Sequence, residues 1–267
     1  MKSEEIAWAL ITGASSGIGY QYARILAAQK IKLLIVSNEE QAIHQQAAAL
    51  EQEFGIEVRS LYLDLSLVDA ADRLMDYCRQ EKLQIDILIN NAGIFYFGEQ
   101  LDQPVQRTRQ MLQLHVVTPT LLCRLFGAEM KRRGYGYILN MSSLSAWSPY
   151  PGIALYASTK RYLKNFSRAF RSEVLPYGVS VTWLCPGAVA TDLYHLNHRL
   201  QRLAIRLGVM MRPEKLARRG IRALFHKRGQ VIPGFINWLF IPWVVMLPAG
   251  FIRWSMRKSG LLPLRHE

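Results

Sequence analysis

The sequence predicts an α/β fold, in which a parallel β-sheet is covered by helices on both of its faces. Apolar runs of strand length alternate with longer segments of helical spacing, and this alternation repeats six times. The chain has 267 residues, half of them hydrophobic, which is enough for one large domain with its own core. No linker interrupts the pattern before about residue 191. One doubly wound domain is therefore the simplest interpretation.

The predicted elements follow one another in a regular order. Strands are predicted at residues 7–12, 32–36, 58–63, 85–89, 137–141 and 179–184, with a last strand at 231–232. Helices are predicted at residues 17–29, 41–54, 69–80, 104–133 and 155–175. We interpret residues 1–267 as a single domain, with 192–228 as a lid over the substrate and 233–267 as an apolar, basic C-terminal extension. The ligand is expected beyond the carboxyl ends of the strands.

The positive charge of the chain is concentrated near its C-terminus. Residues 199–267 contain 14 Lys/Arg and 2 Asp/Glu, which accounts for twelve of the thirteen net positive charges. Nucleic-acid binding would call for aromatic residues interleaved with these charges, whereas two of the three tryptophans in this region lie in an uncharged run at 231–252. We therefore expect no nucleic-acid partner.

The cysteines and the first residues indicate the compartment. Cys78, Cys123 and Cys185 are odd in number and have no metal-like spacing, so we expect reduced thiols and no metal site. The apolar run at residues 6–12 is too short for the core of a signal peptide. These features predict a cytoplasmic protein whose mature chain begins at Met1.

A glycine-rich loop, TGASSGIG, directly follows the first predicted strand and opens the first helix. Gly13 permits a tight turn, Gly17 lets the backbone approach a pyrophosphate, and Gly19 lets the helix pack closely. The N-terminus of the helix then offers free N–H groups to the anion. This loop predicts a Rossmann-type domain that binds a dinucleotide.

The stretch LYASTK places Tyr156 and Lys160 four residues apart, so they share one face of a predicted helix. A phenol has a reference pKa of about 10 and exchanges protons poorly at neutral pH unless its anion is stabilised. A neighbouring ammonium group supplies that stabilisation. The pair therefore suits general acid–base catalysis.

With these two motifs, the chain resembles the classical short-chain dehydrogenase/reductase family. The resemblance also rests on Asp64-Leu65 after the third strand, NNAG at 90–93 after the fourth, Ser143, and PGAVAT at 186–191. The motifs occur in the order of the family across residues 7–191. The resemblance implies a ketone or alcohol oxidoreductase that uses NAD(P)(H).

The resemblance assigns roles residue by residue. Tyr156 gives its proton to a carbonyl oxygen, Lys160 holds the nicotinamide ribose, and Ser143 donates a hydrogen bond to the same oxygen. Ser142 and Ser145 compete for the serine role, and the interval typical of the family selects Ser143. Asn90 is expected to brace the sheet. The implied cofactor site consists of Thr12, Gly13, Ser15, Ser16, Gly17, Ile18, Gly19, Ser37, Asn38, Asp64, Leu65, Asn91, Ala92, Gly93, Tyr156, Lys160, Pro186, Gly187, Val189 and Thr191.

The end of the second strand decides between the two nicotinamide cofactors. A carboxylate there would bind the ribose hydroxyls of NAD, and an arginine would bind the 2′-phosphate of NADP. This chain has Ser37 and Asn38, followed by Glu39, which also suits the first turn of a helix. Without a carboxylate at the expected position, we favour NADP(H).

His115 stands where the family usually has an asparagine that steadies a water next to the lysine. A histidine can donate and accept hydrogen bonds, so His115 is a candidate catalytic residue in a proton relay. The alternative is a buried histidine satisfied by backbone groups. A relay predicts that His115→Asn keeps activity with an altered pH profile.

The C-terminal region suggests a lipophilic substrate or surface. Leucines and arginines form separate helical stripes at residues 196–207, and tryptophans lie within and just after the uncharged run at 231–252. Three prolines in that run argue against one straight membrane span. Peripheral contact with the inner face of the membrane and packing against another subunit both remain open. The family resemblance implies a homodimer or homotetramer.

The leading hypothesis is a reductase or dehydrogenase for a bulky, lipophilic substrate such as a keto-lipid or a steroid. The alternative is a nucleotide-binding, membrane-associated scaffold or redox sensor without catalysis, which His115 and the long tail permit. The presence of Ser143, Tyr156 and Lys160 together favours the enzyme.

Overall fold

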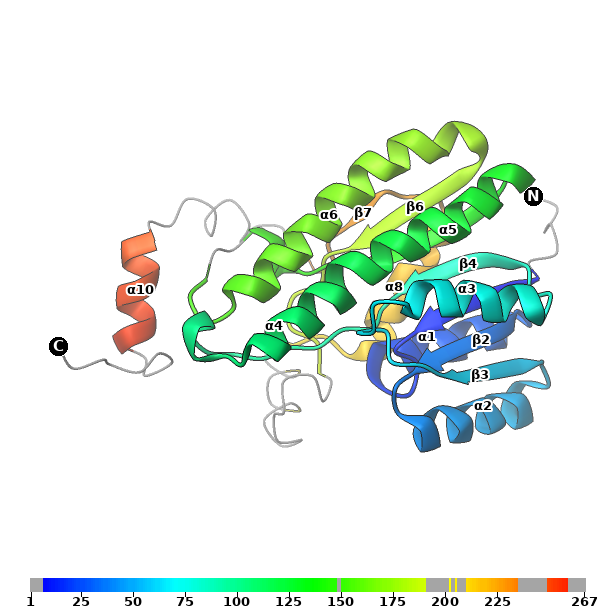
Figure 1. The fold of residues 1–267 in the computed structure, drawn as a ribbon, viewed down its shortest axis with the longest axis horizontal. Helices are drawn as coiled ribbons and strands as arrows, with labels where there is room; N and C mark the ends of the chain where they lie inside the picture. The colour runs from blue at the N-terminus through cyan, green and yellow to red at the C-terminus, as the bar shows by residue number, and fades with distance from the viewer. Residues whose placement is uncertain are drawn as a thin grey trace.

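The computed structural model describes residues 7–147, 150–190, 202, 205, 210–234 and 249–258. Within these residues, seven parallel strands form one sheet in the order β3-β2-β1-β4-β5-β6-β7 (Figure 1). The order reverses direction between β1 and β4, which places a crevice at the carboxyl ends of these two strands. The predicted doubly wound fold is confirmed.

Each predicted strand and helix is present with ends that differ by at most one residue, except that the helix predicted at 104–133 is divided. The strands are β1 Trp8–Thr12, β2 Lys32–Ser37, β3 Val58–Tyr62, β4 Ile85–Asn90, β5 Gly136–Met141, β6 Val179–Leu184 and β7 Gln230–Val231. The helices are α1 Gly17–Ala28, α2 Glu40–Phe54, α3 Ala70–Gln80, α4 Val105–Leu112, α5 Thr118–Arg133, α6 Ala154–Val174, α8 Pro213–Phe225 and α10 Ala249–Lys258. Shorter turns are η1 Gln100–Asp102, η2 Gln113–Val117, η3 Leu144–Trp147 and η4 Leu175–Tyr177.

Helices cover both faces of the sheet because the strands bury alternate side chains on opposite sides. Leu33 and Ile35 of β2 pack with α1, α2 and α8, whereas Leu34 and Val36 pack with α3 and α5. The strand β1, with the sequence WALIT, is buried along its whole length. Such strands read as continuous apolar runs, which is why their positions were predictable.

Two segments differ from the expectation. The predicted helix at 104–133 is interrupted by η2, a π-helical turn that contains His115. Within the expected lid at 192–228, residues 213–225 form α8, whose Leu216, Ile221 and Leu224 are buried against the side of the sheet that α1 covers. This helix is part of the body of the domain. Most of the remaining lid, and Thr191 just before it, lie outside the described residues.

The helical stretch Val105–Arg133 is long and apolar enough to span a bilayer by length and composition. Its residues Leu122, Cys123, Phe126 and Met130 are buried in the core that covers β4 and β5. We therefore interpret it as a core helix of the domain.

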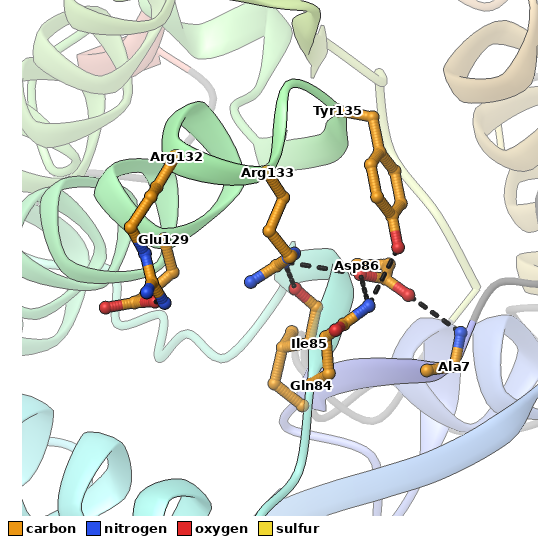
Figure 2. A network of polar contacts seen from close by, with 8 residues as sticks. All are labelled: Ala7, Gln84, Ile85, Asp86, Glu129, Arg132, Arg133 and Tyr135. Carbon is orange, nitrogen blue, oxygen red and sulfur yellow. Dashed lines mark hydrogen bonds and ion pairs between the residues drawn. The ribbon is translucent and has the colours of Figure 1, made fainter.

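A buried network fastens the amino ends of β1 and β4, opposite the crevice (Figure 2). The Asp86 carboxylate accepts hydrogen bonds from the Ala7 N–H at 2.7 Å and the Arg133 guanidinium at 3.2 Å. Arg133 also donates to the carbonyl oxygen of Ile85 at 2.6 Å. Gln84 links Asp86 to the hydroxyl of Tyr135. The network therefore joins the end of α5 to the two central strands.

Candidate active site

The loop between β1 and α1 has the geometry of a phosphate-binding turn. Gly13 and Gly17 have φ angles of +66° and +56°, a region that favours glycine. A Cβ atom on Gly19 would lie 2.0 Å from the Gly13 carbonyl oxygen, so only glycine fits there. Ser16, the N-cap residue of α1, makes no side-chain bond to the first helical turn, which leaves these N–H groups available to an anion.

Thr12 and Asn91 hold this loop to the end of β4. The Thr12 hydroxyl accepts hydrogen bonds from the backbone N–H groups of Asn91 and Ala92, at 2.9 and 3.1 Å. The Asn91 amide donates to the carbonyl oxygens of Thr12 and Gly13, at 3.0 and 3.1 Å. The two crevice-forming strand ends are therefore fixed relative to one another before any ligand binds.

Asn90 and Asp64 make contacts of different kinds. The buried Asn90 amide donates to the Asn140 side chain at 2.8 Å, which braces β4 against β5 as expected. Asp64 accepts a hydrogen bond from the Ser66 N–H at 2.8 Å and shapes the turn after β3. Asp64 therefore caps a local turn rather than α3, whose N-cap residue is Asp69.

The adenosine end of the crevice is polar. The Ser37 hydroxyl donates to the Ser15 hydroxyl at 2.9 Å and accepts from the Glu39 N–H at 3.1 Å, so it is already engaged. Asn38 and Glu39 are exposed and line the crevice. Lys160 is the only lysine or arginine among the described residues that line it, and it belongs to the opposite end.

Lys160 and Tyr156 lie on the buried face of α6, as their spacing predicts. The Lys160 ammonium donates to the carbonyl oxygen of Met141, the last residue of β5, at 2.9 Å. Its nitrogen lies 5.6 Å from the centre of the Tyr156 ring. Burial lowers the pKa of Lys160 to about 8, because the cation loses its hydration.

The three serines after β5 have separate surroundings. The Ser142 hydroxyl donates to the carbonyl oxygen of Lys160 at 2.8 Å and thereby braces α6. Ser143 lines the crevice together with Tyr156, and its oxygen accepts the Ser145 N–H at 3.1 Å. The Ser143 hydroxyl hydrogen can therefore point toward a ligand. Ser145 does not line the crevice.

His115 is 1% exposed and lies between the loop after β4 and helix α6. Its Nε2 atom accepts the Ile94 N–H at 3.0 Å, and its Nδ1 atom lies 3.1 Å from the Thr159 hydroxyl. Burial, and then the positive charge of Lys160, hold the pKa of His115 well below its usual range. The ring is therefore neutral at physiological pH.

One crevice of about 260 Å³ brings these groups together. The crevice is lined by Ser143, Tyr156, Lys160 and His115. The predicted cofactor residues also line it, with three exceptions. Thr12 and Gly19 shape the loop without lining the crevice, and Thr191 lies outside the described residues. Sequence reasoning missed Leu63, Ile94, Leu114 and Met141 as lining residues. Their positions directly beside predicted site residues were the available signal.

Comparison with known proteins agrees with this geometry. Residues 7–200 match the family model described as short chain dehydrogenase. The chain is 30% identical to the very-long-chain 3-oxoacyl-CoA reductase of Mus musculus over 190 residues, which is 70% of this chain and 60% of that protein. The chain thus spans less than two thirds of the length of this curated relative.

Two solved structures share the fold over nearly their whole length. A short-chain dehydrogenase from Sphingobium yanoikuyae in complex with NADPH has a TM-score of 0.78 and 25% identity, and the match covers 96% of this chain and 94% of that one. An alcohol dehydrogenase from Thermococcus sibiricus, complexed with 5-hydroxy-NADP, has a TM-score of 0.72 and 25% identity. This match covers 85% of this chain and 95% of that one.

Proposed function

The chain belongs to the short-chain dehydrogenase/reductase family, and on that premise we propose that it interconverts a ketone and a secondary alcohol with NAD(P)(H). The observation that carries this proposal is the meeting of Ser143, Tyr156 and Lys160 in the same crevice as the glycine-rich loop. A scaffold without catalysis would not need all three side chains there. The enzyme is therefore favoured over the non-catalytic alternative.

The crevice fits a nicotinamide dinucleotide. The positive φ angles of Gly13 and Gly17 and the close approach at Gly19 form a cradle that a Cβ atom would fill. The uncapped start of α1 suits a pyrophosphate. Asp64 and Leu65 would flank the adenine, and Pro186, Gly187 and Val189 would lie beside the nicotinamide. When bound, this group supplies or accepts the hydride.

The side chains of the chain manage the proton. Tyr156 donates its phenolic proton to the carbonyl oxygen of a ketone, or accepts it from an alcohol. The Lys160 ammonium stabilises the phenolate that remains, and Met141 fixes the position of that ammonium. Ser143 donates a hydrogen bond to the substrate oxygen as negative charge grows there.

For the cofactor we propose NADP(H). The last residue of β2 is Ser37 and not a carboxylate, and the exposed Asn38, whose amide can donate hydrogen bonds, lines the adenosine end. The NADPH complex of the Sphingobium relative supports this proposal. Glu39, which also lines the crevice, is the feature that would instead favour NAD(H).

For the substrate we propose a bulky, lipophilic carbonyl compound, either a keto-lipid or a steroid. The Phe95 ring packs edge-on against Tyr156 with centroids 5.0 Å apart, so an apolar wall adjoins the proton donor. Phe97, on the same loop, is 43% exposed. The name of the mouse relative, a 3-oxoacyl-CoA reductase, supports the keto-lipid.

A cofactor-oxidation screen tests the reaction and the substrate class together. NADH and NADPH are each supplied with 3-ketoacyl thioesters, long-chain ketones, ketosteroids and small polar ketones, and absorbance at the nicotinamide band is followed. We expect turnover with at least one lipophilic class and a preference for NADPH. Turnover of small polar ketones alone would reject the substrate proposal, and a preference for NADH would reject the cofactor proposal.

We also propose that the C-terminal region contacts an anionic lipid surface. In α10, Phe251 and Trp254 are 51% and 57% exposed, with ring centroids 5.8 Å apart. The Lys258 ammonium lies 5.2 Å from the Trp254 ring, while Ile252 is buried. An aromatic pair beside cations suits lipid headgroups, and residues 199–267, which include this helix, carry twelve net positive charges.

Co-sedimentation with vesicles tests this contact. Wild type is expected to bind vesicles that contain phosphatidylglycerol and not pure phosphatidylcholine, and the double variant Phe251→Ser, Trp254→Ser is expected to stay in solution. Val68→Ser, which removes an exposed apolar residue before α3, serves as the control. If the double variant binds vesicles like wild type but changes oligomeric state, the region is a subunit contact.

For the assembly we propose a homodimer or homotetramer, as the family resemblance implies. Exposed apolar side chains on and just after α6, Tyr162, Leu175 and Tyr177, are consistent with a covered surface. Light scattering after size-exclusion chromatography gives the mass directly, and a monomer would contradict the proposal.

A further inference from the structure

His115 occupies a local irregularity of the long helix. The π-helical turn η2, Gln113–Val117, separates α4 from α5 and contains His115. Such turns insert an extra residue into a helix and often occur at functional sites. Here the inserted turn brings an imidazole into a fully buried position next to Tyr156 and Lys160, with the Tyr156 ring centroid 5.7 Å from its own.

The hydrogen bonds around His115 define one tautomer. The Ile94 N–H can only donate, so Nε2 must carry the lone pair. The Thr159 hydroxyl donates its hydrogen to the carbonyl oxygen of Tyr156 at 2.8 Å, so it can only accept from the ring. Nδ1 therefore carries the proton. Both ring nitrogens are engaged with protein groups.

This arrangement bridges two parts of the site. Ile94 directly follows Asn91, Ala92 and Gly93, which line the crevice, and Thr159 directly precedes Lys160 on α6. A Cβ atom on Gly93 would lie 3.0 Å from His115 Nε2 and 3.7 Å from Lys160 Nζ. The ring thus fills the space between the cofactor loop and the catalytic pair and sets their separation.

We propose that His115 and Thr159 are positioning residues, in which a fixed neutral Nδ1–H imidazole holds the cofactor loop at a set distance from Tyr156 and Lys160. This inference rests on the proposed function for its kinetic consequence, but not for its tautomer. A proton relay needs a ring that accepts and releases protons, whereas each nitrogen here has a partner that fixes its state. The low pKa of the buried ring points the same way.

Nuclear magnetic resonance of the ¹⁵N-histidine-labelled protein tests the tautomer without a substrate. The His115 signal is identified by its loss in His115→Asn. Coupling patterns of a neutral Nδ1–H tautomer at pH 7 are the expected result. An Nε2–H tautomer or an imidazolium at pH 7 would overturn the proposal. The tautomer measurement does not depend on which reaction the enzyme catalyses.

Kinetics test the positioning role once a substrate is known. Thr159→Val removes the acceptor for Nδ1–H, and we expect kcat to fall about tenfold while the Kd of the cofactor stays within about twofold. Thr159→Ser should recover most of the lost kcat, because it restores the hydroxyl. Ser158→Ala, at an exposed neighbouring position, is the control. An unchanged kcat in Thr159→Val would overturn the role, and so would an ionisation in the pH profile that disappears in His115→Asn. If Thr159→Val does not fold, the tautomer measurement decides.

Discussion

The Lys160 ammonium donates a hydrogen bond to the carbonyl oxygen of Met141 at 2.9 Å, so the end of β5 holds a buried cation beside the Tyr156 ring. The buried ammonium loses its hydration, which lowers the pKa of Lys160. The placement suits catalysis more than folding.

Replacing Lys160 should therefore stabilise the fold while it removes activity. Below pH 8 the folded state holds a desolvated cation, whereas between about 8 and 10.5 the unfolded chain binds the proton that the folded chain has released. The stability of wild type relative to Lys160→Met should thus rise by about 2 to 3 kcal/mol across this window. Urea unfolding at pH 7 and pH 10 measures the difference. Lys215→Met, at an exposed position on α8, is the control, and a gap that does not change with pH would contradict the account.

The adenosine end of the crevice should respond to an added cation. Asn38→Arg is expected to raise the ratio of kcat/KM for NADPH to that for NADH about tenfold, because a guanidinium binds the 2′-phosphate through two charge-assisted hydrogen bonds. Asn165→Arg adds the same charge at an exposed position on α6 and should leave the ratio unchanged. Equal ratios in the two variants would place the adenosine ribose elsewhere.

Gly19 should not tolerate a methyl group. In Gly19→Ala the new Cβ would lie 2.0 Å from the Gly13 carbonyl oxygen, so the phosphate loop must shift away from α1. We expect loss of cofactor binding by fluorescence titration and a destabilisation of about 3 kcal/mol. Gly250→Ala in α10, where nothing lies within 4 Å, is the matched control. Full cofactor affinity in Gly19→Ala would refute the assigned cradle.

The Asp86 network should matter for stability and not for catalysis. Asp86→Asn leaves Arg133 without its buried carboxylate, and we expect a loss of about 3 kcal/mol in chemical unfolding. Glu129→Gln breaks the neighbouring ion pair with Arg132 at the surface, drawn in the same view, and should cost less than about 1 kcal/mol (Figure 2). The opposite ranking would show that the network does not fasten the strands.

Much of this architecture was predictable from the sequence because local patterns specify it. Strands buried on both faces, such as β1, are nearly continuous apolar runs, and Tyr156 and Lys160 share a helix face by their spacing alone. The π-turn at 113–117 was not predictable, because one inserted residue hardly changes the apolar periodicity of a helix.

The links between distant segments were also beyond sequence reasoning. Thr159 lies between Tyr156 and Lys160 in the sequence, but its bond to His115 depends on how α6 packs on η2. Likewise, the hydrogen bond from the Ser37 hydroxyl to Ser15 joins the end of β2 to the loop after β1, and no local pattern in the sequence shows it. Residues 213–225 were assigned to the lid by their place in the chain, whereas the apolar stripe of α8 packs beside α1.

The central claim is that Tyr156 transfers a proton to the substrate beside the bound dinucleotide. A single-turnover experiment measures the oxidation of enzyme-bound NADPH by a keto-lipid in wild type, Tyr156→Phe and the control Tyr162→Phe. The account predicts that Tyr156→Phe binds the cofactor normally and reacts roughly 10² to 10⁴ times more slowly, while Tyr162→Phe matches wild type. Equal single-turnover rates in wild type and Tyr156→Phe would contradict it.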